Sequence, residues 1–163
     1  MDLPTILVIG HVIGTVLGVG GATVAELNVL QALRNGNVNA TAKAMMHANY
    51  TMIRVGTVLI VVSAALLVWW HLSQGNTWVL TSSKVWVKEI MTVAIVLNAV
   101  ALSRRWVPLW LGSAISFTSW WGAMVLGLWR VQYPFWVIFM GYIVAIGIVA
   151  ITLHFVRRKY SKA

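Results

Sequence analysis

A histidine and a lysine stand out in this chain because each lies inside a long apolar run. His11 belongs to "IGHVIGTVLGVGGATVAE" (residues 9–26), and Lys88 belongs to "VWVKEIMTVAIVLNAVAL" (residues 85–102). At about 1.5 Å per helical residue, His11 would lie about 12 Å and Lys88 about 8 Å inside the ends of their helices. Ionisable groups at such depth are costly and mark candidate functional sites. The similar depths predict that the two side chains can meet.

Lys88 has a structural interpretation as well as a functional one. Glu89 follows it directly and Lys84 lies one turn before it. The lysine could pair with Glu89, or its long stem could carry the ammonium group to the membrane interface. The functional interpretation makes Lys88 a metal ligand or an acid–base group.

Small residues follow His11 at helical spacing, so a surface with little side-chain bulk extends from the imidazole along one helix face. Imidazole is a good axial ligand for haem iron, and glycines allow a porphyrin to approach the backbone. The same pattern also favours close packing against another helix. The residues concerned are Gly14, Thr15, Gly18, Gly21 and Ala22.

Composition defines the class of protein that must position these groups. The 163 residues are 60% hydrophobic and only 9% charged, and there is no cysteine, which excludes disulfides and thiolate metal sites. Apolar runs of about twenty residues predict an all-α integral membrane protein, a single bundle of about five transmembrane helices. The predicted spans are residues 4–31, 50–72, 83–102, 107–129 and 135–155, with turn-like linkers at 34–41 and 73–76.

Basic residues predict the orientation of the bundle. The positive-inside rule places the N-terminus outside and the C-terminus in the cytoplasm of a prokaryotic cell, across its inner membrane. This topology, with contact to anionic lipid, accounts for most of the net charge of +9, and no nucleic-acid partner is expected. The residues on the predicted cytoplasmic side are Arg34, Lys43, Arg104, Arg105, Arg157, Arg158, Lys159 and Lys162, whereas Lys84 and Arg130 flank spans on the other side.

Two segments resemble a known family. "GHVIGTVLGVGG" is similar to the "LHxxGxxxWxGG" pattern of small bacterial membrane proteins of the copper-resistance protein D and HemJ-type group, and "VWVKEIMTVAIVLNAVAL" resembles their "xxVKLxLVxxLL" span. HemJ-type proteins are helical bundles that carry haem b and oxidise protoporphyrinogen IX. The resemblance implies that His11 and Lys88 are the histidine and the lysine tied to haem and activity in that family.

The remaining histidines allow further sites. His47 and His71 are separated by about 36 Å if one helix joins them, so His11 with His71 could hold an outer haem and His47 with His154 an inner one. Alternatively, His71 and His154 are interface residues at span ends. His47 beside Met45 and Met46 also offers soft ligands for copper(I).

Glu26 and Arg54 both lie near the predicted cytoplasmic ends of their spans. Because an unpaired charge at depth is costly, we expect a structural ion pair between them. Arg54 as a partner of a haem propionate, and Glu26 as a proton carrier, are the functional alternatives.

These patterns favour a haem b-binding protein that acts in redox chemistry, either electron transfer or HemJ-like porphyrinogen oxidation. His11 would ligate the iron beside Gly14 and Gly18, and Lys88 would be the second ligand or the catalytic acid–base group. The redox partner or porphyrin substrate is left open. The alternatives are a copper or other ion permease and a non-catalytic packing subunit of a homo-oligomer or a larger membrane complex.

Overall fold

The chain forms a bundle of α-helices, as the sequence predicts. The computed structural model describes residues 2–35 and 40–160, so part of the first linker and Lys162 lie outside the described residues. Within that part, five helices are long and apolar enough to cross a membrane. They are α1 (Leu3–Asn35), α2 (Ala40–Ser73), α4 (Ser83–Ser103), α5 (Leu109–Leu128) and α6 (Phe135–Tyr160), and a short helix, α3 (Trp78–Thr81), precedes α4.

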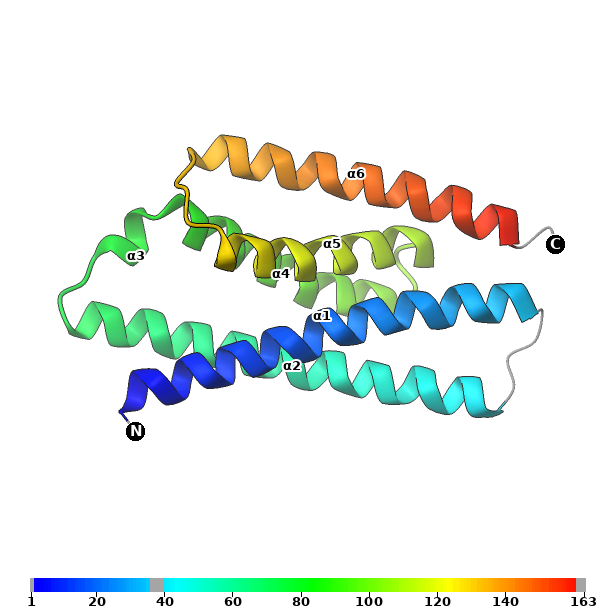
Figure 1. Cartoon of the computed structure of the whole chain (residues 1–163), viewed down its shortest axis with the longest axis horizontal. Helices are drawn as coiled ribbons and strands as arrows, with labels where there is room; N and C mark the ends of the chain where they lie inside the picture. Colours follow the sequence, from blue (N-terminus) through cyan, green and yellow to red (C-terminus); the bar gives the residue numbers. More distant parts are fainter. Residues whose placement is uncertain (1, 36–39, 161–163) are drawn as a thin grey trace.

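The helices form two groups that lie side by side (Figure 1). One group is the antiparallel hairpin of α1 and α2, which has the most extensive contact in the molecule. The other group is α4, α5 and α6, and α5 packs against α1 to join the two. One end of the bundle, the N-terminal end, holds the start of α1 and the α2–α3–α4 connection, and the other, the C-terminal end, holds the end of α6 (Figure 1).

Glycines bring α1 and α2 into close contact. A Cβ atom added to Gly14 would lie 2.9 Å from Leu59 Cβ, and one added to Gly56 would lie 2.9 Å from the Gly14 carbonyl oxygen and the Gly18 nitrogen. A Cβ at Gly18 would overlap the ring of Trp120. The helix-packing interpretation of this glycine face is therefore confirmed. The expectation that Gly14 and Gly18 cradle a porphyrin is wrong, because α2 and Trp120 occupy that face.

Trp120 is the centre of the contact between the two groups of helices. Its side chain is fully buried and packs with Val19, Ala22, Ile60 and Ile95, which come from α1, α2 and α4. Nearly all of its apolar area is thus removed from lipid and water. This contact fixes α5 against the glycine face of the hairpin.

Hydrogen bonds from polar side chains stabilise the packing of α4, α5 and α6 against one another. The Asn98 side chain donates to the Gly112 carbonyl at 2.7 Å, and the hydroxyls of Ser119 and Tyr142 lie 2.6 Å apart in a buried hydrogen bond. Lys84 donates to the carbonyl of Trp129, the residue that ends α5. A cation at a helix C-terminus is favourable because the last carbonyls carry partial negative charge.

The predicted ion pair between Glu26 and Arg54 is wrong. Glu26 instead accepts hydrogen bonds from Arg157 at 2.7 and 3.0 Å, and the same Arg157 nitrogen also donates to Ser113 at 2.9 Å. Arg54 lies over the ring of Tyr50, 4.9 Å from its centroid. The sequence did not indicate Arg157 as the partner of Glu26, because the two residues are far apart in the chain. They come together only where the end of α6 packs near α1 in the tertiary structure.

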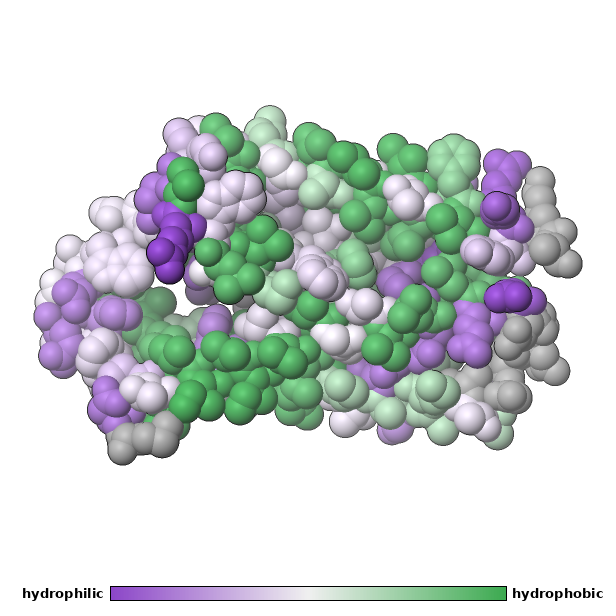
Figure 2. Space-filling view, in the orientation of Figure 1, coloured by the Kyte–Doolittle hydropathy of each residue, from purple (hydrophilic) through white to green (hydrophobic). Residues whose placement is uncertain are grey.

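The outer surface of the bundle is predominantly apolar, and polar side chains gather at its two ends (Figure 2). Large hydrophobic residues on every long helix are exposed, among them Val16, Val58, Leu97, Leu128 and Ile148. A water-soluble protein does not expose such an area, whereas lipid tails solvate it at no cost. The chain is a membrane protein in contact with lipid.

Candidate functional site

A cavity of about 240 Å³ lies in the N-terminal half of the bundle, and we call it the inner cavity. Residues from both groups of helices and from the short helix α3 line it. The polar and aromatic residues that line it are His11 and Thr15 from α1, His71 from α2, Trp78 from α3, Lys88, Glu89 and Thr92 from α4, and Trp120 from α5. His11, Lys88 and His71 therefore line the same cavity.

A serine on α2 favours one tautomer of the neutral His11 ring. The Ser63 hydroxyl donates to the Leu59 carbonyl at 2.6 Å, so its oxygen is left to accept a hydrogen bond. His11 Nδ1 lies 3.0 Å from that oxygen, and both hydrogen bonds are satisfied together when Nδ1 is the donor. The neutral ring then carries its lone pair on Nε2, the nitrogen that is free to bind an iron atom. Histidine ligands are commonly oriented by such a hydrogen bond from the other ring nitrogen.

Two further ring nitrogens at this cavity are buried without a hydrogen-bond partner. They are Nδ1 of His71 and Nε1 of Trp120. A buried polar atom without a partner costs about 1–3 kcal/mol, so most such atoms in native proteins bind a protein group, water or ligand. Both atoms belong to residues that line the inner cavity, and a ligand held there could satisfy them. The rings of Trp70 and Trp78 make T-shaped contacts with the His71 ring, at centroid–centroid distances of 5.1 and 5.3 Å.

Lys88 and Glu89 lie on neighbouring faces of α4. In the described part of the chain neither takes part in an ion pair or a side-chain hydrogen bond, so the predicted alternative of a Lys88–Glu89 pair is not formed. Consecutive helical residues point about 100° apart, which explains why the two side chains do not meet. Both residues line the inner cavity.

A second, wider cavity of about 620 Å³, the outer groove, lies between α2 and α4 on the lipid-facing side. Its lining is almost entirely apolar and includes Val61, Leu80, Trp86 and Val93. The two cavities are neighbours that share a line of residues, namely Val68, Val79, Val85, Glu89 and Thr92. The inner cavity thus adjoins a lateral groove that faces the membrane interior.

The other predicted metal positions are not brought together. His47 is exposed on α2, whereas His154 packs against Trp110 on α5 with centroids 5.8 Å apart. Among the described residues α2 and α6 make no contact, and no group of three or more His, Asp or Glu side chains could hold a metal ion. The structure gives no support to an inner haem between His47 and His154, or to a metal-ion site built only from these side chains.

Two contributors to the site, Ser63 and Trp78, were missed from the sequence. Ser63 was a detectable signal, because it is a lone hydroxyl in the apolar run "VLIVVSAALLV". Trp78 and the short helix α3 were not detectable, since four residues give too little periodicity. The placement of Trp120 on Gly18 depends on the packing of α5 against α1 and has no local signal.

Comparison with protein-family models, with curated proteins and with solved structures gives no match.

Proposed function

We propose that this chain is a haem b-binding membrane protein that acts in redox chemistry, with the porphyrin held at the inner cavity and His11 as an axial ligand. The observation that carries the proposal is the His11–Ser63 hydrogen bond, which leaves Nε2 of a half-buried ring as a lone-pair donor in a cavity that Lys88 also lines. Haem iron needs only one or two protein ligands, because the porphyrin supplies four nitrogens, so a cluster of three protein ligands is not required.

The residues present fit a haem in their donor set. His11 supplies the first ligand, and Lys88 or His71 supplies the second or pairs with a propionate. Trp120 Nε1 offers a hydrogen-bond donor to a polar edge of the group. Ligand pockets usually span about 300–1,000 Å³. The inner cavity alone is smaller than this, and the outer groove adjoins it at Val68, Val85 and Glu89.

Each residue then has a physical role. Haem would supply a one-electron redox couple, tuned by ligand identity and burial. Ser63 orients the His11 ring and fixes its tautomer. The tryptophans and valines exclude water, and Lys88, one of the ionisable groups that line the cavity, would exchange a proton with a substrate held there. Porphyrinogen oxidation and simple electron transfer both use this arrangement.

We place the protein in a prokaryotic cytoplasmic membrane with the N-terminal end of the bundle outside. Support comes from the described basic residues, because most of them gather at the C-terminal end, as the positive-inside rule requires of a cytoplasmic face. The inner cavity would then open toward the outer half of the bilayer. A redox partner or substrate would have to reach it through lipid or from the periplasmic side.

The test is an absorption spectrum of purified protein supplied with haem, in the oxidised and dithionite-reduced forms. We expect a Soret band that shifts on reduction, that is lost in His11→Ala and that is partly restored there by added imidazole. Lys88→Ala and His71→Ala identify the second ligand, because only the variant that lacks it changes the band position. Ser63→Ala should weaken haem affinity by about 10–100-fold, the usual cost of losing such an orienting partner.

The matched control is His154→Ala, which removes a histidine at the opposite end of the bundle. Its spectrum should equal that of the unaltered protein. Equal haem binding by His11→Ala and His154→Ala would mean that the haem is adventitious, and a protein that stays colourless in excess haem would overturn the proposal.

A further inference from the structure

A third cavity, which we call the C-terminal groove, lies at the other end of the bundle and plays no part in the proposed function. Its volume is about 420 Å³, and it opens between α1, α5 and α6. Val29, Leu33 and Leu109 form its apolar part, and Trp110, His154 and Arg158 lie around it. The lining residues belong to the last turns of α1 and α6 and the first turn of α5, so the groove runs from the apolar flank of the bundle to its polar end.

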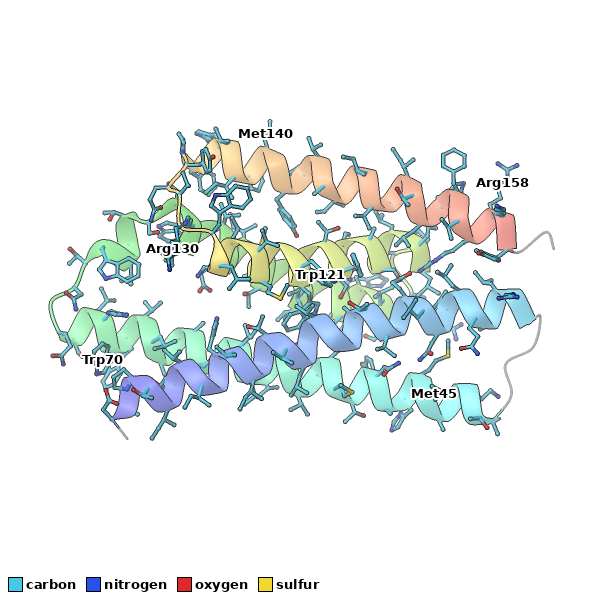
Figure 3. The ribbon with its side chains drawn as sticks, in the orientation of Figure 1. Met45, Trp70, Trp121, Arg130, Met140 and Arg158 are labelled. Atoms are coloured by element: carbon cyan, nitrogen blue, oxygen red, sulfur yellow. The ribbon has the colours of Figure 1, made fainter. Side chains whose placement is uncertain are left out.

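Arginine gives this groove a positive charge. Arg157 and Arg158 both line it. Arg157 is held rigidly by Glu26 and Ser113, and its Nε atom is buried without a partner. Glu26 offsets the charge of Arg157, and among the described residues no acidic side chain lines the groove, so Arg158 gives it a net positive charge. Arg158 lies near the end of α6, at the C-terminal end of the bundle (Figure 3).

The backbone of α5 adds to this positive potential. Pro108 precedes α5 and provides no side-chain cap, so the amides of Leu109 and Trp110 at the start of the helix are not capped by it. Leu109 and Trp110, the first residues of the helix, line the groove. The N-terminal end of a helix favours anions, so it reinforces the charge of Arg158.

We infer that the C-terminal groove binds an anionic phospholipid. The headgroup phosphate lies at Arg158 and the start of α5, and an acyl chain lies along Val29, Leu33 and Leu109. The positive charge of the groove favours an anionic ligand. The apolar lining continues along a membrane-facing flank, and this favours a lipid over a soluble phosphate. Trp110 and His154 provide the amphipathic rings that suit the headgroup level.

The experiment is native mass spectrometry of the purified full chain, titrated separately with phosphatidylglycerol and phosphatidylcholine in the same detergent. We expect phosphatidylglycerol to bind more tightly by at least about fivefold, the value of one basic contact near a membrane surface. Arg158→Gln should remove that preference. Arg34→Gln is the matched control, since it removes the same charge from the same end of the bundle, at a position that does not line the groove.

A second pair of variants tests the acyl-chain part without changing charge. Leu33→Trp fills the groove and should weaken binding of phosphatidylglycerol, whereas Leu27→Trp, on the lipid-facing side of the same helix, should not. If Arg158→Gln and Arg34→Gln weaken the binding of phosphatidylglycerol equally, the lipid is attracted by the general positive charge of this end of the bundle. That result would overturn the proposed site. Displacement of the lipid by inorganic phosphate at equal concentration would assign the site to free phosphate and also overturn it.

Discussion

The contact between Gly18 and Trp120 makes a sharp prediction about stability, because α1 carries a matched control two residues away. A Cβ atom at Gly18 would overlap three atoms of the buried Trp120 ring, whereas a Cβ at Gly20 would meet nothing within 4 Å. Both substitutions to alanine gain the same helix propensity, about 1 kcal/mol at most. That gain cancels when the two variants are compared, so the difference between them measures the overlap alone.

We expect Gly18→Ala to be less stable than Gly20→Ala by about 1–3 kcal/mol, the usual cost of overpacking a core. The assay is reversible unfolding in mixed micelles of mild detergent and dodecyl sulfate, followed by circular dichroism. A double-mutant cycle adds a second check, because Gly18→Ala should cost almost nothing in a Trp120→Ala background. Equal unfolding free energies for Gly18→Ala and Gly20→Ala would refute the packing of α5 on the glycine face.

Two further predictions concern buried polar contacts, and the same unfolding assay measures both. Glu26→Gln leaves the buried Arg157 without its counter-ion and should lower the free energy of unfolding by about 3–5 kcal/mol. Arg54→Gln should change the free energy of unfolding by less than about 1 kcal/mol, because Arg54 lies over an exposed ring. A larger loss in Arg54→Gln than in Glu26→Gln would instead support the Glu26–Arg54 ion pair predicted from the sequence. Ser119→Ala leaves the Tyr142 hydroxyl buried without a partner and should cost about 1–3 kcal/mol, and an unchanged stability would mean that this bond contributes nothing.

The amino-acid sequence by itself determined the class of fold. Runs of apolar residues near the thickness of a bilayer allow only helices, because every backbone amide must find its partner within the segment. The local pattern also singled out His11 and Lys88, since ionisable residues are rare at such depth. Hydropathy and charge are local properties, so they can be detected without knowing which helices are neighbours.

Tertiary structure alone decided which helices are neighbours and what fills the space between them. The glycine face after His11 suited a porphyrin and a helix equally well, and the packing of α2 and Trp120 settled it in favour of the helix. Glu26 found Arg157, 131 positions away, because α1 and α6 converge at the C-terminal end. Ser63 became the orienting partner of His11 only when α2 packed against α1. Apolar helices pack through shape, and shape complementarity is a property of pairs of surfaces that no single segment carries.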